Sequence, residues 1–372
     1  MDGEIYYPNY TLEREISTFI KVWISVVVSL CFCYFSTKFV PKGMPRLFSF
    51  IPIFTLFFAL PLKLHSANLC GCTAFSIAWL SNFKLLLLAF GKGPLSAPSL
   101  SFPDFIAIGC FPIRVLRSPL PTSHVYLENS LKSQNNQNQP PKGHNRENRN
   151  YGTKVAFLAL FWPVYGYSDR INPKVMLASY CFHIYFTLEI LLATAAAAAQ
   201  ALFGLELEPQ FDKPYLSSSV QNFWGRRWNL VASRSLRSTV YEPALCVSAK
   251  LIGRKWASLP AVMCTFMVSA LMHEIMFYYM GRLQPTWEIT WFFLLHGACV
   301  VVEIWVKKVV KDRWRLPLLI STPMTLGFVM ITVFWLFIPQ LLRCKVYARA
   351  FEEYAMLGAF LKHIVAGDLK LS

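Results

Sequence analysis

Residues 257–280 read ASLPAVMCTFMVSALMHEIMFYYM, an apolar run that contains His273 and Glu274 near its end. An α-helix needs about 20 mainly apolar residues to cross the hydrocarbon core of a bilayer, so this stretch is long enough to span a membrane. An ionisable side chain inside such a span is costly and marks a functional site by default. The stretch therefore predicts both a transmembrane helix and a candidate site at His273.

Apolar runs of this kind recur along the whole chain. Of its 372 residues 55% are hydrophobic and 15% are charged, against about 25% charged residues in an ordinary soluble domain. Because hydrocarbon offers no partners to unpaired backbone groups, each run is expected to form a helix. The pattern predicts one all-α, polytopic membrane domain over residues 1–372. Its eight expected spans are 19–37, 47–62, 69–90, 154–168, 175–203, 257–280, 286–306 and 318–338.

The connectors between these runs carry most of the basic residues. Cytosolic connectors are enriched in lysine and arginine, which places 38–46, 91–153, 204–256 and 307–317 in the cytosol. The same alternation places the tail after residue 339 in the lumen, although this tail is basic. Within 91–153, the Pro- and Gly-rich start is expected to lie along the membrane surface, and the polar part, about 123–152, to be disordered.

Charge and cysteine content exclude several classes of protein. The net charge is +16, but the basic residues lie between the apolar runs and form no basic helix or zinc-finger spacing. No nucleic-acid partner is therefore expected. The ten cysteines form no CxxC pair, so neither a disulfide framework nor a metal site is predicted. The acidic start lacks the basic residues of a cleavable signal peptide, so the first span is expected to be a retained anchor. Lys84, near a span end, is expected to snorkel toward the headgroups.

His273 and His296 are the candidate acid–base groups. Histidine titrates near neutrality, so His273 can accept a proton from an alcohol that attacks a thioester; a packing histidine is an equally supported interpretation. Glu274 lies about 100° around the helix from His273, so the two do not face one substrate atom. His296 and Glu303 lie seven residues apart on nearly the same helix face. This spacing favours a buried structural ion pair over a catalytic one.

A basic and aromatic string, Phe223–Asn229, lies in the connector 204–256. It contains Trp224, Arg226, Arg227 and Trp228. Arginine forks suit phosphate oxygens, and tryptophan stacks on flat rings, so the string suits the phosphates and adenine of coenzyme A. Composition alone favours the plainer interpretation that these residues are anchors at the headgroup level. Asn229 is a neutral polar group that can position a carbonyl or a reacting hydroxyl.

Five stretches carry a resemblance to a known family. They are NFWGRRWN (222–229), SALMHE (269–274), PTWEITWFFLLHG (285–297), GLELEPQF (204–211) and NFKLLL (82–87). Together they resemble the signature of plant wax synthases, long-chain-alcohol O-fatty-acyltransferases of the membrane-bound O-acyltransferase superfamily. The resemblance covers nearly the whole chain outside the polar loop. Asn222 departs from the pattern, which has an acidic residue there, and this puts a local hydrogen bond in doubt.

The resemblance implies transfer of a long-chain fatty acyl group from acyl-CoA to the hydroxyl of a long-chain fatty alcohol. His273 then matches the superfamily's catalytic histidine and acts as general base, while Asn229 matches its second polar position. His296, with Glu303, would support the site. Acyl-CoA is a co-substrate, no cofactor or metal is expected, and the endoplasmic reticulum is the implied membrane.

Three alternatives remain open at this stage. A relative of the wax synthases that esterifies sterols would keep the chemistry and change the acceptor. A transporter would use the same buried polar groups, but it predicts an internal repeat and paired broken helices that the sequence lacks. A non-catalytic lipid-binding protein would tolerate the loss of His273 without a change in any product.

Overall fold

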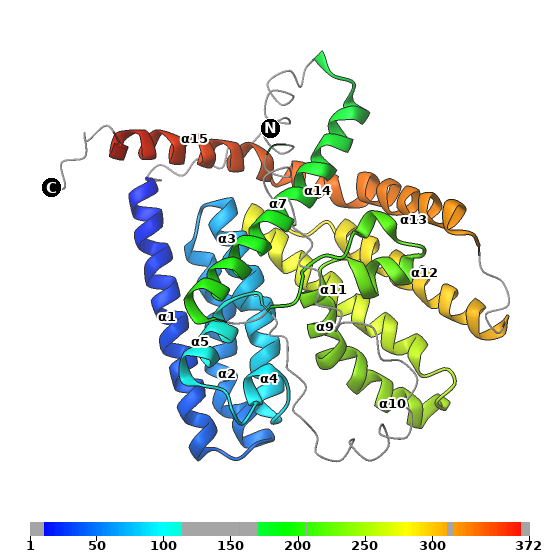
Figure 1. Ribbon diagram of the computed structural model, residues 1–372, viewed down its shortest axis with the longest axis horizontal. Helices are drawn as coiled ribbons and strands as arrows, with labels where there is room; N and C mark the ends of the chain where they lie inside the picture. Colours follow the sequence, from blue (N-terminus) through cyan, green and yellow to red (C-terminus); the bar gives the residue numbers. More distant parts are fainter. Residues whose placement is uncertain (1–10, 114–155, 157–169, 205–206, 311–315, 366–372) are drawn as a thin grey trace, which may run out of the picture.

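Helices make up the regular structure of the described residues, which are 11–113, 156, 170–204, 207–310 and 316–365 of a computed structural model. Within these described residues, seven helical segments are long and apolar enough to cross a membrane, and each coincides with an expected span (Figure 1). The remaining expected span, 154–168, lies outside the described residues apart from residue 156. The prediction of an all-helical polytopic membrane protein is confirmed.

Four of the seven segments are single helices and three contain a change of helix type. The single helices are α1 (Leu12–Phe39), α7 (Pro173–Phe203), α11 (Ser258–Gly281) and α12 (Glu288–Val309). The others are α2 (Met44–Ala59) with η1 (Leu60–Lys63), α3 (Ala67–Thr73) with η2 (Ala74–Ser81) and α4 (Asn82–Ala89), and α13 (Leu318–Thr332) with η8 (Val333–Phe337) and α14 (Ile338–Arg343). Of the inserted segments, η2 and η8 are π-helical, a conformation that is frequent at functional sites.

Shorter helices occupy the connectors. They are η3 (Pro94–Ser96), α5 (Phe102–Cys110), η5 (Pro214–Leu216), α8 (Val220–Asn222), η6 (Phe223–Arg227), α9 (Leu230–Leu236), η7 (Arg237–Tyr241) and α10 (Glu242–Ile252). The last helix, α15 (Val346–Val365), follows the seventh span and runs across one end of the bundle in Figure 1. The predicted basic connector 204–256 is thus largely helical, with no segment long enough to span within its described residues.

Two apolar cores and a seam between them hold the bundle together. One core joins α1, α2, α4 and α5, and the other joins α11, α12 and α14; Figure 1 places these groups on opposite sides of the molecule. A smaller cluster joins η2, α9 and α11. This cluster, called the seam cluster below, consists of Trp79, Leu80, Val231, Ala232, Leu236 and Met272. It brings the third span and the basic connector against the helix that carries His273.

The helix α5 packs against the bundle; whether this part of the connector also lies along the membrane surface stays a prediction. Its Phe105 and Ile108 are buried in the core that contains α1 and α2. The Pro- and Gly-rich stretch before α5 suggested an irregular surface segment. The apolar residues within α5 instead recur on one helix face, and burying that face against α1 removes it from water.

Lys84 holds the end of α5 and does not snorkel. Its Nζ donates hydrogen bonds to the carbonyl oxygens of Ile108 (2.7 Å) and Phe111 (2.8 Å), and its side chain is buried. The last carbonyl groups of a helix have no partner within that helix, and a buried ammonium group needs oxygen acceptors. The two requirements meet here, so the expected position of Lys84 at the headgroups was wrong.

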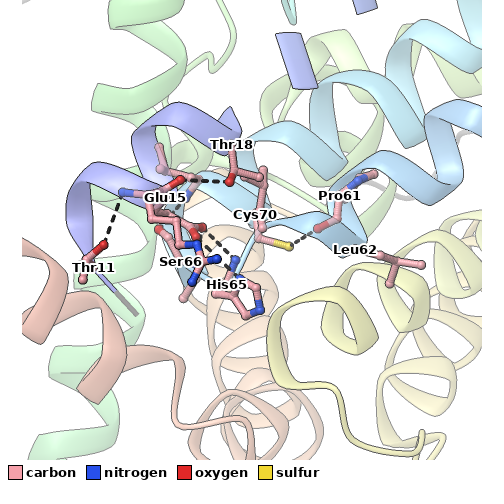
Figure 2. A network of polar contacts seen from close by, with 12 residues as sticks. Thr11, Glu15, Thr18, Pro61, Leu62, His65, Ser66 and Cys70 are labelled. Carbon is pink, nitrogen blue, oxygen red and sulfur yellow. Dashed lines mark hydrogen bonds and ion pairs between the residues drawn. The ribbon is translucent and has the colours of Figure 1, made fainter. Parts of the chain in front are cut away.

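Two carboxylates tie the start of α3 to both ends of the chain. Figure 2 shows Glu15 of α1, whose Oε1 accepts hydrogen bonds from the backbone N–H groups of His65 (2.7 Å) and Ser66 (2.8 Å). Glu353 of α15 accepts from the Ser66 hydroxyl (2.7 Å) and the Ala67 N–H (2.5 Å). The first N–H groups of a helix lack partners within it and favour negative charge. The helix α15 is therefore joined to the bundle through α3.

Candidate active site

His273 lies in the second half of α11 with one ring nitrogen engaged and the other free. Its Nδ1 is 2.7 Å from the carbonyl oxygen of Ser269, one turn earlier. A carbonyl oxygen only accepts, so Nδ1 carries the proton and a neutral ring has its lone pair at Nε2. No hydrogen bond joins Nε2 to another residue in the described part of the chain. The imidazole is therefore oriented by its own helix and has Nε2 available as a base.

Aromatic rings enclose this imidazole. The ring centroid of His273 is 4.2 Å from that of Phe293 on α12 and 5.0 Å from that of Trp79 in η2. Phe337 in η8 adds a third, more distant contact at 6.4 Å. Three different spans thus surround His273 with apolar side chains. The free nitrogen therefore lies on a partly buried ring with mainly apolar neighbours.

Glu274 points away from His273, as the helical spacing predicted. Its Oε1 accepts hydrogen bonds from both the backbone N–H and the hydroxyl of Thr290, each at 3.0 Å. Thr290 lies in the first turn of α12, where N–H groups have no partner within the helix. Glu274 therefore fixes the start of α12, the helix that places Phe293 on His273.

His296 has both ring nitrogens engaged, in contrast to His273. It is 0% exposed; its Nδ1 accepts a hydrogen bond from the Trp224 indole N–H (2.9 Å), and its Nε2 lies 2.8 Å from the Thr332 hydroxyl. An indole only donates, so in a neutral His296 the proton is on Nε2, which donates to Thr332. The ring joins three elements, η6, α12 and α13, and has no free nitrogen for proton transfer.

The expected ion pair between His296 and Glu303 is wrong. The Oε1 of Glu303 accepts from the Lys307 Nζ at 2.5 Å, and its Oε2 accepts from the backbone N–H of Gln221 at 2.9 Å. Seven residues span about 10 Å along a helix axis, whereas Lys307 lies only one turn away. Glu303 therefore joins α12 to α8, beside the basic and aromatic string.

Both tryptophans of that string are packed against other aromatic rings. The Trp224 ring contacts Phe293 (centroids 5.7 Å apart), which itself packs against His273 at a tilt of 33°. Trp228 stacks on Phe223, with centroids 5.4 Å apart and an interplanar angle of 18°. The Trp228–Phe223 stack lies within the string, and Trp224 links the string to the surroundings of His273.

The two arginines of the string have different environments. The Arg227 Nε donates to the Asn222 Oδ1 at 2.8 Å, and its Nη1 donates to the carbonyl oxygen of Asp212 at 3.1 Å. The local hydrogen bond that the departure at Asn222 put in doubt is therefore present with a neutral acceptor. Arg226 is exposed and has no hydrogen-bond partner among the described residues. Of the two, Arg226 is available to a ligand.

Asn229 caps the helix that reaches the seam cluster. Its backbone is in the left-handed region, with φ of 37°, and its Oδ1 accepts from the Ala232 N–H at 3.2 Å. Ala232 packs in the seam cluster together with Trp79, which contacts His273. The structure thus brings the helix of Asn229 close to His273, with no hydrogen bond between the two side chains.

Trp79 is the neighbour of His273 that the sequence did not single out. It lies three residues before the stretch 82–87 that carries part of the family resemblance, in a run of apolar residues. Sequence offers one signal, an indole N–H in the middle of a membrane span, where acceptors are scarce. That signal alone does not distinguish Trp79 from the other tryptophans of the spans.

Comparison with known proteins supports the family resemblance. A family model described as the membrane bound O-acyl transferase family matches residues 207–295. An acyl-CoA–sterol O-acyltransferase of Arabidopsis thaliana is 47% identical over 347 residues, 93% of this chain and 96% of that protein. A long-chain-alcohol O-fatty-acyltransferase of Simmondsia chinensis is 41% identical over 359 residues, 96% of this chain and 99% of that protein. A probable long-chain-alcohol O-fatty-acyltransferase of Arabidopsis thaliana is 37% identical over 357 residues, 95% of this chain and 97% of that protein.

These identities extend over nearly the full length of each relative. The region that matches the family model contains both His273 and the basic and aromatic string. By these identities and the match to the family model, the chain belongs to the membrane bound O-acyl transferase family.

Proposed function

We propose that this multi-pass membrane acyltransferase transfers a long-chain fatty acyl group from acyl-CoA to the hydroxyl of an apolar alcohol. The observation that carries the proposal is the free Nε2 of His273, held by the Nδ1 contact with Ser269 and enclosed by aromatic rings of three spans. A neutral imidazole in such a place suits proton abstraction from a hydroxyl. The endoplasmic reticulum is the membrane that we propose for it.

In the proposed reaction His273 acts first as base and then as acid. Its Nε2 accepts the proton of the alcohol while the alcohol oxygen attacks the carbonyl carbon of the thioester. The carbon–sulfur bond then breaks, and the CoA thiolate takes the proton from Nε2. With both substrates bound among these apolar side chains, less water would reach the thioester, which would limit competing hydrolysis. Asn229, at the start of α9, would orient one reacting group, and His296 would hold Trp224 and α12 in place.

Acyl-CoA is proposed to approach from the side of the basic and aromatic string. Arg226 is exposed and free, so it is the arginine that we assign to a phosphate of CoA. Trp224, Trp228 and Arg227 then support the string through their packing and hydrogen bonds. Glu303 contributes in the same way, through its hydrogen bond to the backbone of α8.

Replacement of Arg226 by alanine is expected to raise KM for palmitoyl-CoA roughly two- to fivefold with little change in kcat, because one exposed charge pair is weak. The matched control is Arg227→Ala. This change removes the hydrogen bonds to Asn222 and Asp212, so it should lower the unfolding temperature. Initial rates at several palmitoyl-CoA concentrations, with thermal unfolding on the same samples, measure both. An unchanged KM in Arg226→Ala would refute the assignment.

The acceptor has two candidates. A long-chain fatty alcohol is the acceptor named in the Simmondsia chinensis relative and in several others. A sterol is favoured by a specific observation, since the sterol O-acyltransferase of Arabidopsis thaliana has the higher identity, 47% against 41% and 37%. The two candidates share the same proton transfer at His273 and differ in the shape of the alcohol.

The test supplies labelled palmitoyl-CoA with either hexadecanol or a sterol to membranes from a host that makes neither ester. We expect the label in an ester of one or both alcohols, and the ratio of the two initial rates identifies the acceptor. A pure transporter or a lipid-binding protein would give no labelled ester with either alcohol. That outcome, with inserted and folded protein, would contradict the proposed function.

A further inference from the structure

The indole N–H of Trp79 is a buried donor without an acceptor. The Trp79 side chain is 2% exposed, and no oxygen or nitrogen of the described residues accepts a hydrogen bond from its Nε1. A buried donor that has left water and gained no partner lowers the stability of the folded protein. Each such group needs an explanation, and beside a reacting group a ligand that supplies the missing acceptor is one.

The position of Trp79 indicates which ligand atom that is. Its ring meets the His273 ring nearly edge-on, with centroids 5.0 Å apart and an interplanar angle of 78°. It also packs in the seam cluster with Ala232, the residue whose N–H is capped by Asn229. Trp79 therefore contacts His273 directly and shares a cluster with the helix that begins after Asn229.

The backbone around Trp79 fixes the direction of its ring. The residue belongs to the π-helical segment η2, and Phe75, one turn earlier, packs edge-on against it with centroids 5.5 Å apart. The edge-on contacts with Phe75 and His273 restrict the rotation of the indole. A donor held in advance stabilises developing charge without the cost of reorganisation.

We propose that the Trp79 N–H donates a hydrogen bond to the carbonyl oxygen of the acyl thioester while that oxygen gains negative charge. The assignment rests on the proposed function. As the alcohol oxygen bonds to the carbonyl carbon, the C=O π electrons move onto the oxygen that faces Trp79, and the alcohol proton moves to His273. When this electron pair returns, the carbon–sulfur bond breaks and the thiolate takes the proton from His273.

The test uses Trp79→Phe, which keeps a six-membered aromatic ring and removes the N–H together with the rest of the five-membered ring. We expect kcat to fall roughly a hundredfold, the effect of removing one donor to a developing oxyanion. The inhibition constant of S-hexadecyl-CoA, a thioether without the carbonyl oxygen, should stay at the wild-type value. All measurements use the full chain, purified in phospholipid nanodiscs.

Trp23→Phe is the matched control. Trp23 in α1 also has a buried Nε1 without a partner among the described residues, and it packs against Phe19, away from the His273 ring. We expect this variant to keep the wild-type kcat. An equal fall in both variants would show a packing effect of losing an indole and would overturn the proposal.

Two other results would overturn it. A wild-type kcat in Trp79→Phe would show that the Trp79 N–H does not stabilise the carbonyl oxygen. Weaker binding of S-hexadecyl-CoA, in proportion to the lost rate, would place Trp79 in the binding of the acyl chain instead. The wild-type protein is measured first. If it forms no ester, the proposed function fails; if it forms ester and the Trp79 results differ from those expected, only the role of Trp79 fails.

Discussion

Replacement of His273 by asparagine is expected to lower acyl transfer roughly 10²- to 10⁴-fold, the range that general acid–base catalysis contributes. The asparagine amide can still donate toward the Ser269 carbonyl that now accepts from Nδ1. It has no counterpart of the free Nε2, so the alcohol proton has no acceptor. Initial rates of ester formation with labelled palmitoyl-CoA measure the loss.

The control for this prediction is the stability of the same variant. Because Nε2 has no partner in the described part of the chain, its removal breaks no hydrogen bond. The unfolding temperature should therefore stay close to that of the wild type. An asparagine variant that keeps the wild-type rate would exclude His273 as the base.

His296→Ala is expected to lower the free energy of unfolding by about 2–5 kcal/mol, through the cavity it leaves and the hydrogen bonds it removes. The ring is fully buried and joins the Trp224 indole to the Thr332 hydroxyl. Its loss leaves the indole N–H without an acceptor and separates η6 from α13. Thermal unfolding of the purified variant measures the effect.

His296→Gln is the graded control for this change. The glutamine amide can still reach Thr332 but provides no acceptor at the place of Nδ1, so it should recover only part of the stability. Activity per folded molecule should fall less in both His296 variants than in His273→Asn. A His296 variant with wild-type stability and no activity would contradict the structural role.

The membrane spans were predictable because one physical requirement sets them. A helix that crosses hydrocarbon needs a long apolar run, and that run is visible in the sequence alone. The expected spans 175–203 and 257–280 thus lie within a residue of Val175–Phe203 and Ser258–Gly281. Secondary structure inside the spans followed from the lack of backbone partners in lipid.

The contacts of polar side chains were not predictable in the same way. His296 accepts from Trp224, 72 residues earlier, and Lys84 donates to Ile108 on another helix. Each partner depends on which helices become neighbours, and the lengths and spacing of apolar runs do not show that. The spacing of His296 and Glu303 suggested an ion pair because both lie on one face. Lys307, one turn from Glu303, donates a hydrogen bond to the carboxylate instead.

The site shows the same division. Sequence predicted that Glu274 does not face the same point as His273, because adjacent residues diverge around a helix. It did not predict the free Nε2, which follows from the carbonyl of Ser269 and the rings of Trp79 and Phe293. The roles of His273 and Asn229 in the reaction remain predictions.

The most direct test of this account compares the two histidines on one preparation. His273→Asn and His296→Ala are purified side by side, and each is measured for ester formation and for its unfolding temperature. The structure predicts that His273→Asn loses ester formation and keeps its unfolding temperature. His296→Ala should unfold at a lower temperature and keep more activity per folded molecule. Ester formation at the wild-type rate by His273→Asn, or a stable and inactive His296→Ala, would contradict the central claim that His273 holds the reacting nitrogen.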